Sequence, residues 1–382
     1  MMMMMMMMMM KGYLTGPLIL LLFSSTVSGL GSVVRRGYHY RHMYYTWAEA
    51  QSSCRSSYTD LALYYKQSDR DSTYFRNYNA WVGLYKEDND GDGDGDDDDW
   101  TWTNGKDLNS VKYGPNETSS THTCAYFAFG AHRMYAGTCD EKYFFICHFK
   151  ESGPQLHYIF ISQAMSWSDA RQYCKDKHVD LAAFQDVSKL NLEIHEENFP
   201  AWIGLHKEED SFKWSTGVSD YTHWAPGQPG DNGDCVTISS STKEMATHNC
   251  LSRLPFVCFT DNLVLVKENK TWEEALEHCH SMRSPHSHQH YFRYELASVQ
   301  PGEDQEIVIA TILGSDTEEV WAGLRFMEGH WWWVNGADML YSNLPVCPLQ
   351  WEHCGALSKN DTVNMLNRDC LEKKNFLCYK LN

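Results

Sequence analysis

The sequence predicts an α+β fold, built as three consecutive modules that each combine a helix with several strands. Cysteines fall into three groups of four with nearly the same internal spacing, and the last two of every group enclose seven residues. Self-similarity at a period of about 105 to 120 residues indicates repeated modules. In each module a helix-like pattern comes first and strand-like patterns follow, which favours an α+β architecture. The groups are Cys54, Cys124, Cys139 and Cys147; Cys174, Cys235, Cys250 and Cys258; and Cys279, Cys354, Cys370 and Cys378.

Every module opens with the pattern Trp-x-x-Ala-x-x-x-Cys, which starts at Trp47, Trp167 and Trp272. Positions i, i+3 and i+7 share one face of a helix, so these residues predict a core-facing stripe that carries a cysteine. A Ser or Thr precedes each Trp, and an acidic residue lies three positions after that Ser or Thr. This is the pattern of a capping box, so we predict that each helix begins at its Trp.

Short buried strands come next in each module. The segments Trp-Val-Gly-Leu, Trp-Ile-Gly-Leu and Trp-Ala-Gly-Leu begin at Trp81, Trp202 and Trp321. A hairpin strand follows each of them, with aromatic residues at every second position and a glycine turn after it. The alternating aromatic residues are Trp100 and Trp102, Phe212 and Trp214, and Trp331 and Trp333.

Charge and the first residues indicate where the protein acts. With 50 acidic and 32 basic residues among its 382, the chain carries a formal charge of −18, which argues against nucleic acid, heparin and anionic membranes as default partners. Lys11, an apolar stretch over 14–23 and small residues up to Gly29 have the order of a secretory signal peptide, expected to span 1–29. No later stretch is apolar enough to span a membrane, and no lipid-anchor tail ends the chain. We therefore expect a secreted, extracellular protein with disulfide bonds.

Taken together, these landmarks resemble the C-type lectin-like domain, present three times in tandem. The chain is similar to macrophage mannose-receptor-like C-type lectins, which are built from strings of such domains. The resemblance extends from Tyr38 to Tyr379 and rests on the helix cysteine, the Trp-Ile-Gly-Leu strand, the Trp-x-Trp hairpin and the final cysteine pair. It implies domains at 37–149, 156–259 and 262–380, with two disulfides in each.

The resemblance also implies how the cysteines pair, which sequence alone leaves open. One disulfide per domain ties the helix to the last strand, as Cys54–Cys147, Cys174–Cys258 and Cys279–Cys378. A second disulfide per domain lies within the long loop, as Cys124–Cys139, Cys235–Cys250 and Cys354–Cys370. Cys347 has no partner in the family pattern and is either a buried or capped free thiol or a residue that pairs between chains.

In sugar-binding members of the family, a Ca²⁺ ion in the long loop coordinates two sugar hydroxyls, and Ca²⁺ takes six to eight oxygen ligands. The family has five ligand positions, and the second domain comes nearest to them with the segment that begins at Trp224. Gln228 matches, whereas Gly230 stands at the next ligand position and Gly233 at the acid position of the family pattern. Ala246 and Thr247 replace an Asn-Asp pair of that pattern. Asp231 and Asp234 are candidates to replace the missing acids.

The other two domains keep fewer of the sugar-site features. The third domain has Glu352 and Asn367 at ligand positions, and the first has only Asn116. Because no domain keeps more than two of the five positions, we expect recognition of glycans or glycoproteins, as in innate defence, without a full calcium–sugar site. Ca²⁺ would bind only through a degraded ligand set. Two alternatives stay open: a protein-binding or scaffold role with no sugar recognition, and modules that act as spacers.

An acidic insert in the first domain spans 87–99. Its residues Asp88, Asp90, Asp92 and Asp99 match the register of an EF-hand calcium loop. Strands flank it in place of the required helices, so a solvated hairpin tip is the preferred interpretation and weak Ca²⁺ binding the alternative.

An insert in the third domain holds His286, His288 and His290. On an extended strand, three alternate imidazoles lie on one side, as a Zn²⁺ or Cu²⁺ site requires. No acidic residue or cysteine nearby supplies a fourth ligand, so a polar surface loop is the preferred interpretation.

Sequons at Asn116, Asn269 and Asn360 are glycosylation acceptors in a secreted chain. Catalytic motifs are lacking: His195-Glu196 has no second His of a zinc-protease helix, and neither Gly-x-Ser-x-Gly nor a Walker loop occurs. We predict no catalytic residues and no enzyme activity.

Overall fold

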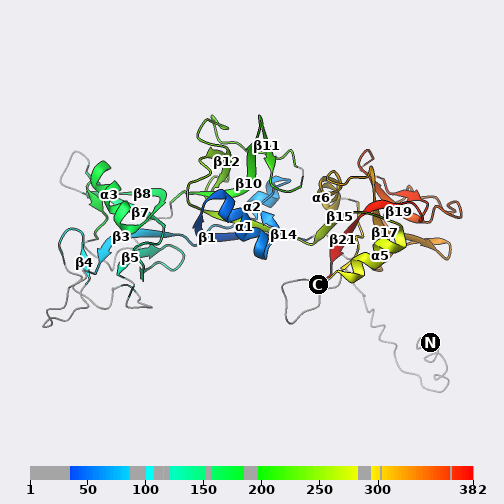
Figure 1. Ribbon diagram of the computed structural model, residues 1–382, viewed down its shortest axis with the longest axis horizontal. Helices are drawn as coiled ribbons and strands as arrows, with labels where there is room; N and C mark the ends of the chain where they lie inside the picture. Colours follow the sequence, from blue (N-terminus) through cyan, green and yellow to red (C-terminus); the bar gives the residue numbers. More distant parts are fainter. Residues whose placement is uncertain are drawn as a thin grey trace, which may run out of the picture. The chain divides into compact units, whose positions relative to one another are not determined.

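The computed structural model describes residues 35–86, 100–106, 115, 121, 123–150, 156–184, 197–217, 219–282, 294–301, 303–361 and 364–381. These residues form three seven-stranded sheets, each packed against a helix that carries a cysteine (Figure 1). The combination of helix and sheet in each domain confirms the predicted α+β class. The three domains hold two disulfides each. Within this described part of the chain, no helix is both long and apolar enough to cross a membrane.

The three cysteine-bearing helices begin at the predicted tryptophans. They are α1 (Trp47–Ser57), α3 (Trp167–Lys177) and α5 (Trp272–Ser281), and the Trp, Ala and Cys of each pattern are buried. In α1 and α5 both hydrogen bonds of the capping box form. In α3 the Ser166 hydroxyl accepts from the backbone N–H of Asp169, and the carboxylate of Asp169 accepts from that hydroxyl. The local sequence therefore defines the helix starts.

The third domain is built from one continuous stretch of chain. Its main sheet has the order β15-β21-β17-β19-β20, with β18 paired to β17 and β16 paired to β21. Both predicted disulfides of this domain are confirmed, Cys279–Cys378 and Cys354–Cys370. The elements are β15 (Leu263–Lys270), β16 (Tyr294–Leu296), α6 (Glu303–Ile312), β17 (Glu319–Met327), β18 (His330–Trp333), β19 (Cys354–Ser358), β20 (Leu366–Arg368) and β21 (Lys374–Lys380).

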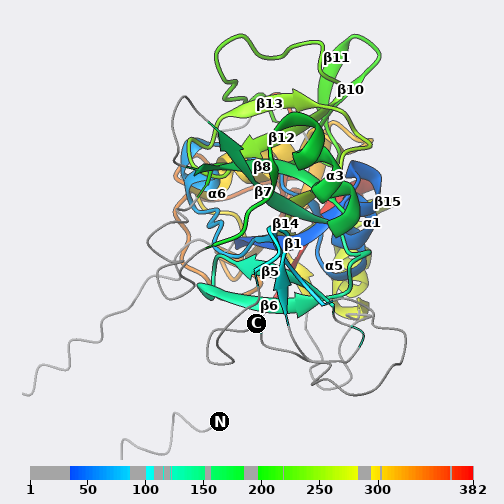
Figure 2. The same cartoon turned by 90° about the vertical axis from the view of Figure 1, so that its left-hand side faces the viewer.

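The first two sequence repeats exchange their N-terminal segments. One sheet combines β1 (Arg36–Tyr45) and β2 (Asp60–Leu61) of the first repeat with strands of the second repeat, in the order β1-β14-β10-β12-β13. In Figure 1 the blue helix α1 and strand β1 accordingly lie with the green strands β10 and β12. Figure 2 shows the same second-repeat strands from another side. These strands are β10 (Pro200–Glu208), β11 (Ser211–Trp214), β12 (Cys235–Ser239), β13 (Met245–His248) and β14 (Leu254–Asp261).

The other exchanged sheet has the reciprocal composition. Its order is β6-β5-β3-β7-β8, with β4 paired to β3 and β9 paired to β7, so β8, α3 and β9 of the second repeat pack on strands of the first. We name this unit domain A and the unit that contains β1 and β10 domain B. The strands of domain A are β3 (Asn79–Tyr85), β4 (Thr101–Trp102), β5 (Cys124–Ala128), β6 (Arg133–Gly137), β7 (Tyr143–Lys150), β8 (Leu156–Met165) and β9 (Asp180–Leu181).

The exchange corrects two of the predicted disulfides. Cys54 pairs with Cys258 and Cys147 pairs with Cys174, so the predicted pairs Cys54–Cys147 and Cys174–Cys258 are wrong. The loop disulfides Cys124–Cys139 and Cys235–Cys250 are confirmed. The domain boundaries 37–149, 156–259 and 262–380 delimit the sequence repeats and stay a prediction, since the sheets of A and B each draw on two repeats.

Chain connectivity gives the physical reason for the exchange. Strand β7 ends at Lys150 and β8 begins at Leu156, and the two pair in antiparallel register from Lys150↔Leu156 onward. Neighbouring strands joined by a short connection close a loop at low entropic cost, whereas β1 and β7 are separated by nearly the whole first repeat. Between β14 and β15 only Asn262 intervenes, which is shorter than the two residues of a tight hairpin. β15 therefore pairs with β21 of its own repeat.

Domains A and B also share an aromatic core. The ring of Tyr78 stacks on Phe129 with 4.0 Å between centroids and lies 4.5 Å from the ring of Phe199. The ring centroid of Phe199 in turn lies 5.6 Å from the ring centroid of Phe144 in β7. The hydroxyl of Tyr78 accepts a hydrogen bond from the backbone N–H of Glu197 at 2.7 Å. Burial of several rings against one another is strongly stabilising, so A and B fold as partners.

Candidate functional site

The long loop of domain B carries the segment that most resembles a calcium–sugar site. Gln228, whose peptide bond to Pro229 is cis, has its side-chain oxygen Oε1 turned into the loop. This oxygen accepts hydrogen bonds from the backbone N–H of Gly230 at 3.0 Å, the backbone N–H of Thr247 at 2.9 Å and the hydroxyl of Thr247 at 2.8 Å. A carbonyl oxygen has two lone pairs, so three donors saturate it.

Thr247 is the last residue but one of β13, at a position where the family pattern has an aspartate ligand. Its side chain is buried, and besides Gln228 it contacts the backbone of Gly230, whose N–H and carbonyl both lie 3.0 Å from its oxygen. Gln228 and Thr247, which correspond to two metal-ligand positions of the family pattern, are therefore hydrogen-bonded to each other. Sequence comparison identified Thr247 only as a lost ligand, whereas the structure shows that it closes the loop.

Gly233 occupies the acid position of the family pattern. Its φ is +139°, and a Cβ atom built there would lie 2.4 Å from the backbone oxygen of His248. No side chain fits at this position unless the backbone moves, so a carboxylate cannot be supplied from it. The side-chain oxygens of Gln228 and Thr247 are thus bonded to each other, and the position of Gly233 supplies no carboxylate.

The remaining predicted residues of this loop have different roles. Trp224 is half-buried: its ring packs edge-on against Phe212 at 5.1 Å, and its backbone bridges to Met245. Asp231 and Asp234 are exposed on the loop surface. Trp224 is therefore part of the packing that supports the loop, whereas the two aspartates face solvent.

In the third domain the two candidate ligands meet. The side-chain amide of Asn367 donates a hydrogen bond to the carboxylate of Glu352 at 2.8 Å. Next to them, the guanidinium of Arg368 binds the carboxylate of Glu319 in a bidentate arrangement, at 2.9 Å from Nε and 2.6 Å from Nη2. Burial would raise the pKa of Glu319, but hydrogen bonds from Arg368 and Lys374 outweigh it and lower this pKa. The two candidate ligands therefore form an acid–amide pair, and a charged cluster of strand residues includes the neighbouring Arg368.

One group of three metal-ligand side chains lies close together in the described part of the chain, formed by Glu273, Cys354 and Cys370. The two sulfur atoms of this group are joined in a disulfide, so they cannot act as thiolate ligands. Several predicted residues lie outside the described ranges: 1–29, Asp88, Asp90, Asp92, Asp99, Asn116, His286, His288 and His290.

The other predicted positions are exposed. Asn269 accepts a hydrogen bond from the amide of Asn375 at 2.9 Å, and Asn360 donates one to Glu318 at 3.2 Å. Glycosylation at both stays a prediction. Cys347 is a free cysteine and exposed, so the buried interpretation is wrong, whereas a capped thiol and pairing between chains both stay open.

Comparisons with known proteins agree with this architecture. The family model of the lectin C-type domain matches residues 44–149, 163–260 and 268–380. The C-type mannose receptor 2 of Homo sapiens is 24% identical over 230 residues, which cover 50% of this chain and 15% of the receptor. The secretory phospholipase A2 receptor of Oryctolagus cuniculus is 23% identical over 238 residues, which cover 51% of this chain and 16% of that receptor.

Among solved structures, human lithostathine at 1.3 Å aligns with a TM-score of 0.26 and 22% identity, covering 31% of this chain and 82% of that one. The lectin CEL-I of Cucumaria echinata aligns with a TM-score of 0.27 and 19% identity, over 31% and 89% of the respective chains. The chain spans about one sixth of the length of the curated receptors that it matches. Three matches of one family model across most of its length place the chain in the family of the C-type lectin domain.

Proposed function

We propose that the chain is a secreted recognition protein that binds carbohydrate or glycoprotein ligands through its long-loop faces, without a full calcium–sugar site. The observation that carries this proposal is the contact between Gln228 and Thr247, at 2.8 Å from hydroxyl to amide oxygen. With both positions bonded to each other and Gly233 closed to any side chain, ligand recognition has to rely on hydrogen bonds and packing.

Secretion is supported by two independent features. Residues 1–29 have the order of a signal peptide, and the chain forms six disulfides, which persist in oxidising compartments. The matched receptors are lectin-like proteins rather than enzymes, which supports a binding role. Mannose appears in the name of one relative, and neutral hexoses are accordingly among the ligands to test.

The test is binding of the secreted, enzymatically deglycosylated protein to a broad glycan panel, once with Ca²⁺ and once with EDTA. We expect the same glycans to bind in both conditions. Loss of binding in EDTA would contradict the proposal and make Gln228, Asp231, Asp234 and Glu352 the residues to mutate. Absence of binding in both conditions would favour the alternative below.

The alternative function is protein binding with no sugar recognition, and one observation favours it. The long loop of the third domain exposes several large apolar side chains, with Val346 82% exposed and Trp351 57% exposed. Exposed apolar residues that gather in one loop are typical of protein-binding surfaces. The double variant Val346→Ser/Trp351→Ser tests this alternative, because it should weaken capture of a protein ligand by this loop.

A further inference from the structure

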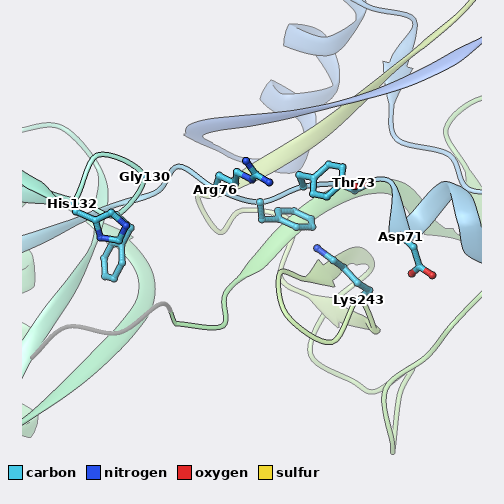
Figure 3. A pocket seen from close by; sticks show the side chains of 9 residues that line it. Asp71, Thr73, Arg76, Gly130, His132 and Lys243 are labelled. Atoms are coloured by element: carbon cyan, nitrogen blue, oxygen red, sulfur yellow. The ribbon is translucent and has the colours of Figure 1, made fainter. Parts of the chain in front are cut away.

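A surface hollow of about 500 Å³ lies where domains A and B meet (Figure 3). Three segments line it: residues 71–76, which follow α2 (Gln67–Asp71), the turn between β5 and β6 at 129–132, and Lys243 in the turn between β12 and β13. Its volume falls within the roughly 300–1,000 Å³ of small-ligand sites. No long-loop position discussed above contributes to it, so the hollow is separate from the loop faces.

Two positively charged side chains line the hollow. Arg76 and Lys243 both line it, and neither forms an ion pair with any acidic residue of the described ranges. The acidic residue of the hollow, Asp71, is instead bound to the guanidinium of Arg70 at 2.9 Å. On a chain with a formal charge of −18, two cations that form no ion pair within the described ranges are a local reversal of the overall field and attract anions.

The backbone and an aromatic ring hold Lys243 in place. Lys243 has a φ of +61°, and its Nζ lies 3.8 Å from the centroid of the Phe75 ring. One N–H of the ammonium donates to the carbonyl of Ser240 at 2.8 Å, which leaves two of its three donors for a ligand. In Figure 3 the amino group of Lys243 is turned toward the segment that carries Arg76, whereas the carboxylate of Asp71 lies at the far end.

Burial disfavours the charged form of Lys243 unless an anion lies close to its ammonium group. Desolvation lowers the pKa of Lys243 to about 8, and the attraction of Asp71 offsets only part of that effect. Burying a charge disfavours the charged form unless an opposite charge approaches it. A bound anion would supply that charge.

Aromatic rings form the wall beside the two cations. Tyr74 is 68% exposed, and the guanidinium carbon of Arg76 lies 5.5 Å from the centroid of its ring. Phe75 and Phe129 line the same hollow. Aromatic walls with a few placed polar groups are the usual composition of small-molecule sites. The ring of a saccharide presents a face of C–H groups that can lie on such a wall while an acidic substituent contacts the cations.

We propose that this hollow binds a saccharide that carries a sulfate or phosphate ester, with Arg76 and Lys243 as the charged contacts and Tyr74 and Phe75 as the wall for the sugar ring. The site goes beyond the proposed function, because it lies outside the long loops and needs no ligand there. Sulfate and phosphate esters share the oxyanion chemistry that a guanidinium and an ammonium recognise.

The test is calorimetric titration of the full secreted chain with glucose 6-sulfate, glucose 6-phosphate, unmodified glucose and inorganic sulfate at low ionic strength. We expect at least one of the two esters to bind and unmodified glucose not to bind. Arg76→Gln and Lys243→Gln should each weaken the bound ester by at least tenfold, and Lys243→Arg should keep most of the affinity. Arg133→Gln is the matched control, because Arg133 is exposed next to the same turn and does not line the hollow.

Three outcomes would overturn the proposal. Neither ester binds; an ester binds equally well to Arg76→Gln and Lys243→Gln; or inorganic sulfate binds as tightly as the esters, which removes the saccharide from the site. These results are distinguishable from failure of the proposed function, since binding of neutral glycans at the loop faces is independent of Arg76 and Lys243.

Discussion

Cys54 in α1 is bonded to Cys258 in β14, across 204 positions of the sequence, and this bond links the helix of the first repeat to the last strand of the second. The reciprocal bond joins Cys147 to Cys174 across 27 positions. Each of these two disulfides joins a cysteine of the first repeat to a cysteine of the second, so domains A and B depend on each other. The exchange leads to predictions that differ from those for three independently folded repeats.

The disulfide exchange can be read directly by mass spectrometry. Digestion of the non-reduced, secreted protein should release peptides that join Cys54 to Cys258 and Cys147 to Cys174. The third domain provides an internal control, since its peptide should join Cys279 to Cys378. A peptide that joins Cys54 to Cys147 would contradict the exchange.

Removal of the long-range bond should destabilise domain B. The double variant Cys54→Ser/Cys258→Ser opens a loop of 204 positions, which corresponds to roughly 5 kcal/mol of unfolding free energy in the chain-entropy model. Denaturant unfolding followed by tryptophan fluorescence measures it. The third domain should unfold as in the unmodified chain, and a uniform shift of every transition would argue against the assignment of this bond to domain B.

Gly233 and Gly227 both have a positive φ, but replacing them by alanine should differ greatly in its cost to stability, because only the position of Gly233 is closed to a side chain. Gly233→Ala should cost more than about 3 kcal/mol, because strain of about 1–3 kcal/mol adds to a clash with the backbone of His248. Gly227→Ala is the matched control, since Gly227 has a φ of +76° but nothing within 4 Å of its Cβ position. Thermal unfolding compares the two, and equal losses would show that the close approach at Gly233 has no energetic effect.

Binding of an acidic saccharide in the A–B hollow should depend on pH. Lys243 has a pKa of about 8, so its ammonium is charged below this pH and neutral above it. Affinity should therefore be full near pH 6.5 and fall as the pH rises from about 8 to 10. Asp71, Arg70, Arg76, His132 and Tyr74 are the other titratable or charged groups at the hollow or beside it.

The variant Lys243→Arg separates this effect from titration of the other groups. Arginine stays charged over the whole range, so the decline between pH 8 and 10 should disappear in calorimetric titrations with the ester. A decline of unchanged size in Lys243→Arg would assign the pH dependence to another group.

The exposed thiol of Cys347 should react in the native state. A thiol-specific reagent is expected to label one cysteine per chain without denaturant, because the other twelve cysteines are in disulfides. Cys347→Ser should abolish the label. If the unmodified protein takes up no label and runs as a dimer on a non-reducing gel, Cys347 pairs between chains instead.

Much of the local structure was predictable, because it depends on neighbours in sequence. The start of each cysteine-bearing helix follows from a hydroxyl and an acidic residue three positions apart, and the burial of Trp81, Trp202 and Trp321 follows from apolar patterning. The loop disulfides, such as Cys124–Cys139, followed instead from the family resemblance, because sequence alone leaves the pairing open. The degraded state of the calcium ligands was visible at Gly233 from residue identity alone.

What the sequence by itself determined, then, is the repeat, the start of each cysteine-bearing helix and the buried tryptophan strands; the residues missing from a calcium site followed from the family resemblance. Only the tertiary structure decided which copy of the last strand each helix joins, because β7 and β14 offer equivalent partners to α1 and no local pattern distinguishes them. The short connection between Lys150 and Leu156 favours pairing of β7 with β8 and leaves β14 for β1. Tertiary structure likewise brought Thr247 to Gln228 and Lys243 to Phe75, since contacts between distant segments follow from packing rather than from spacing along the chain.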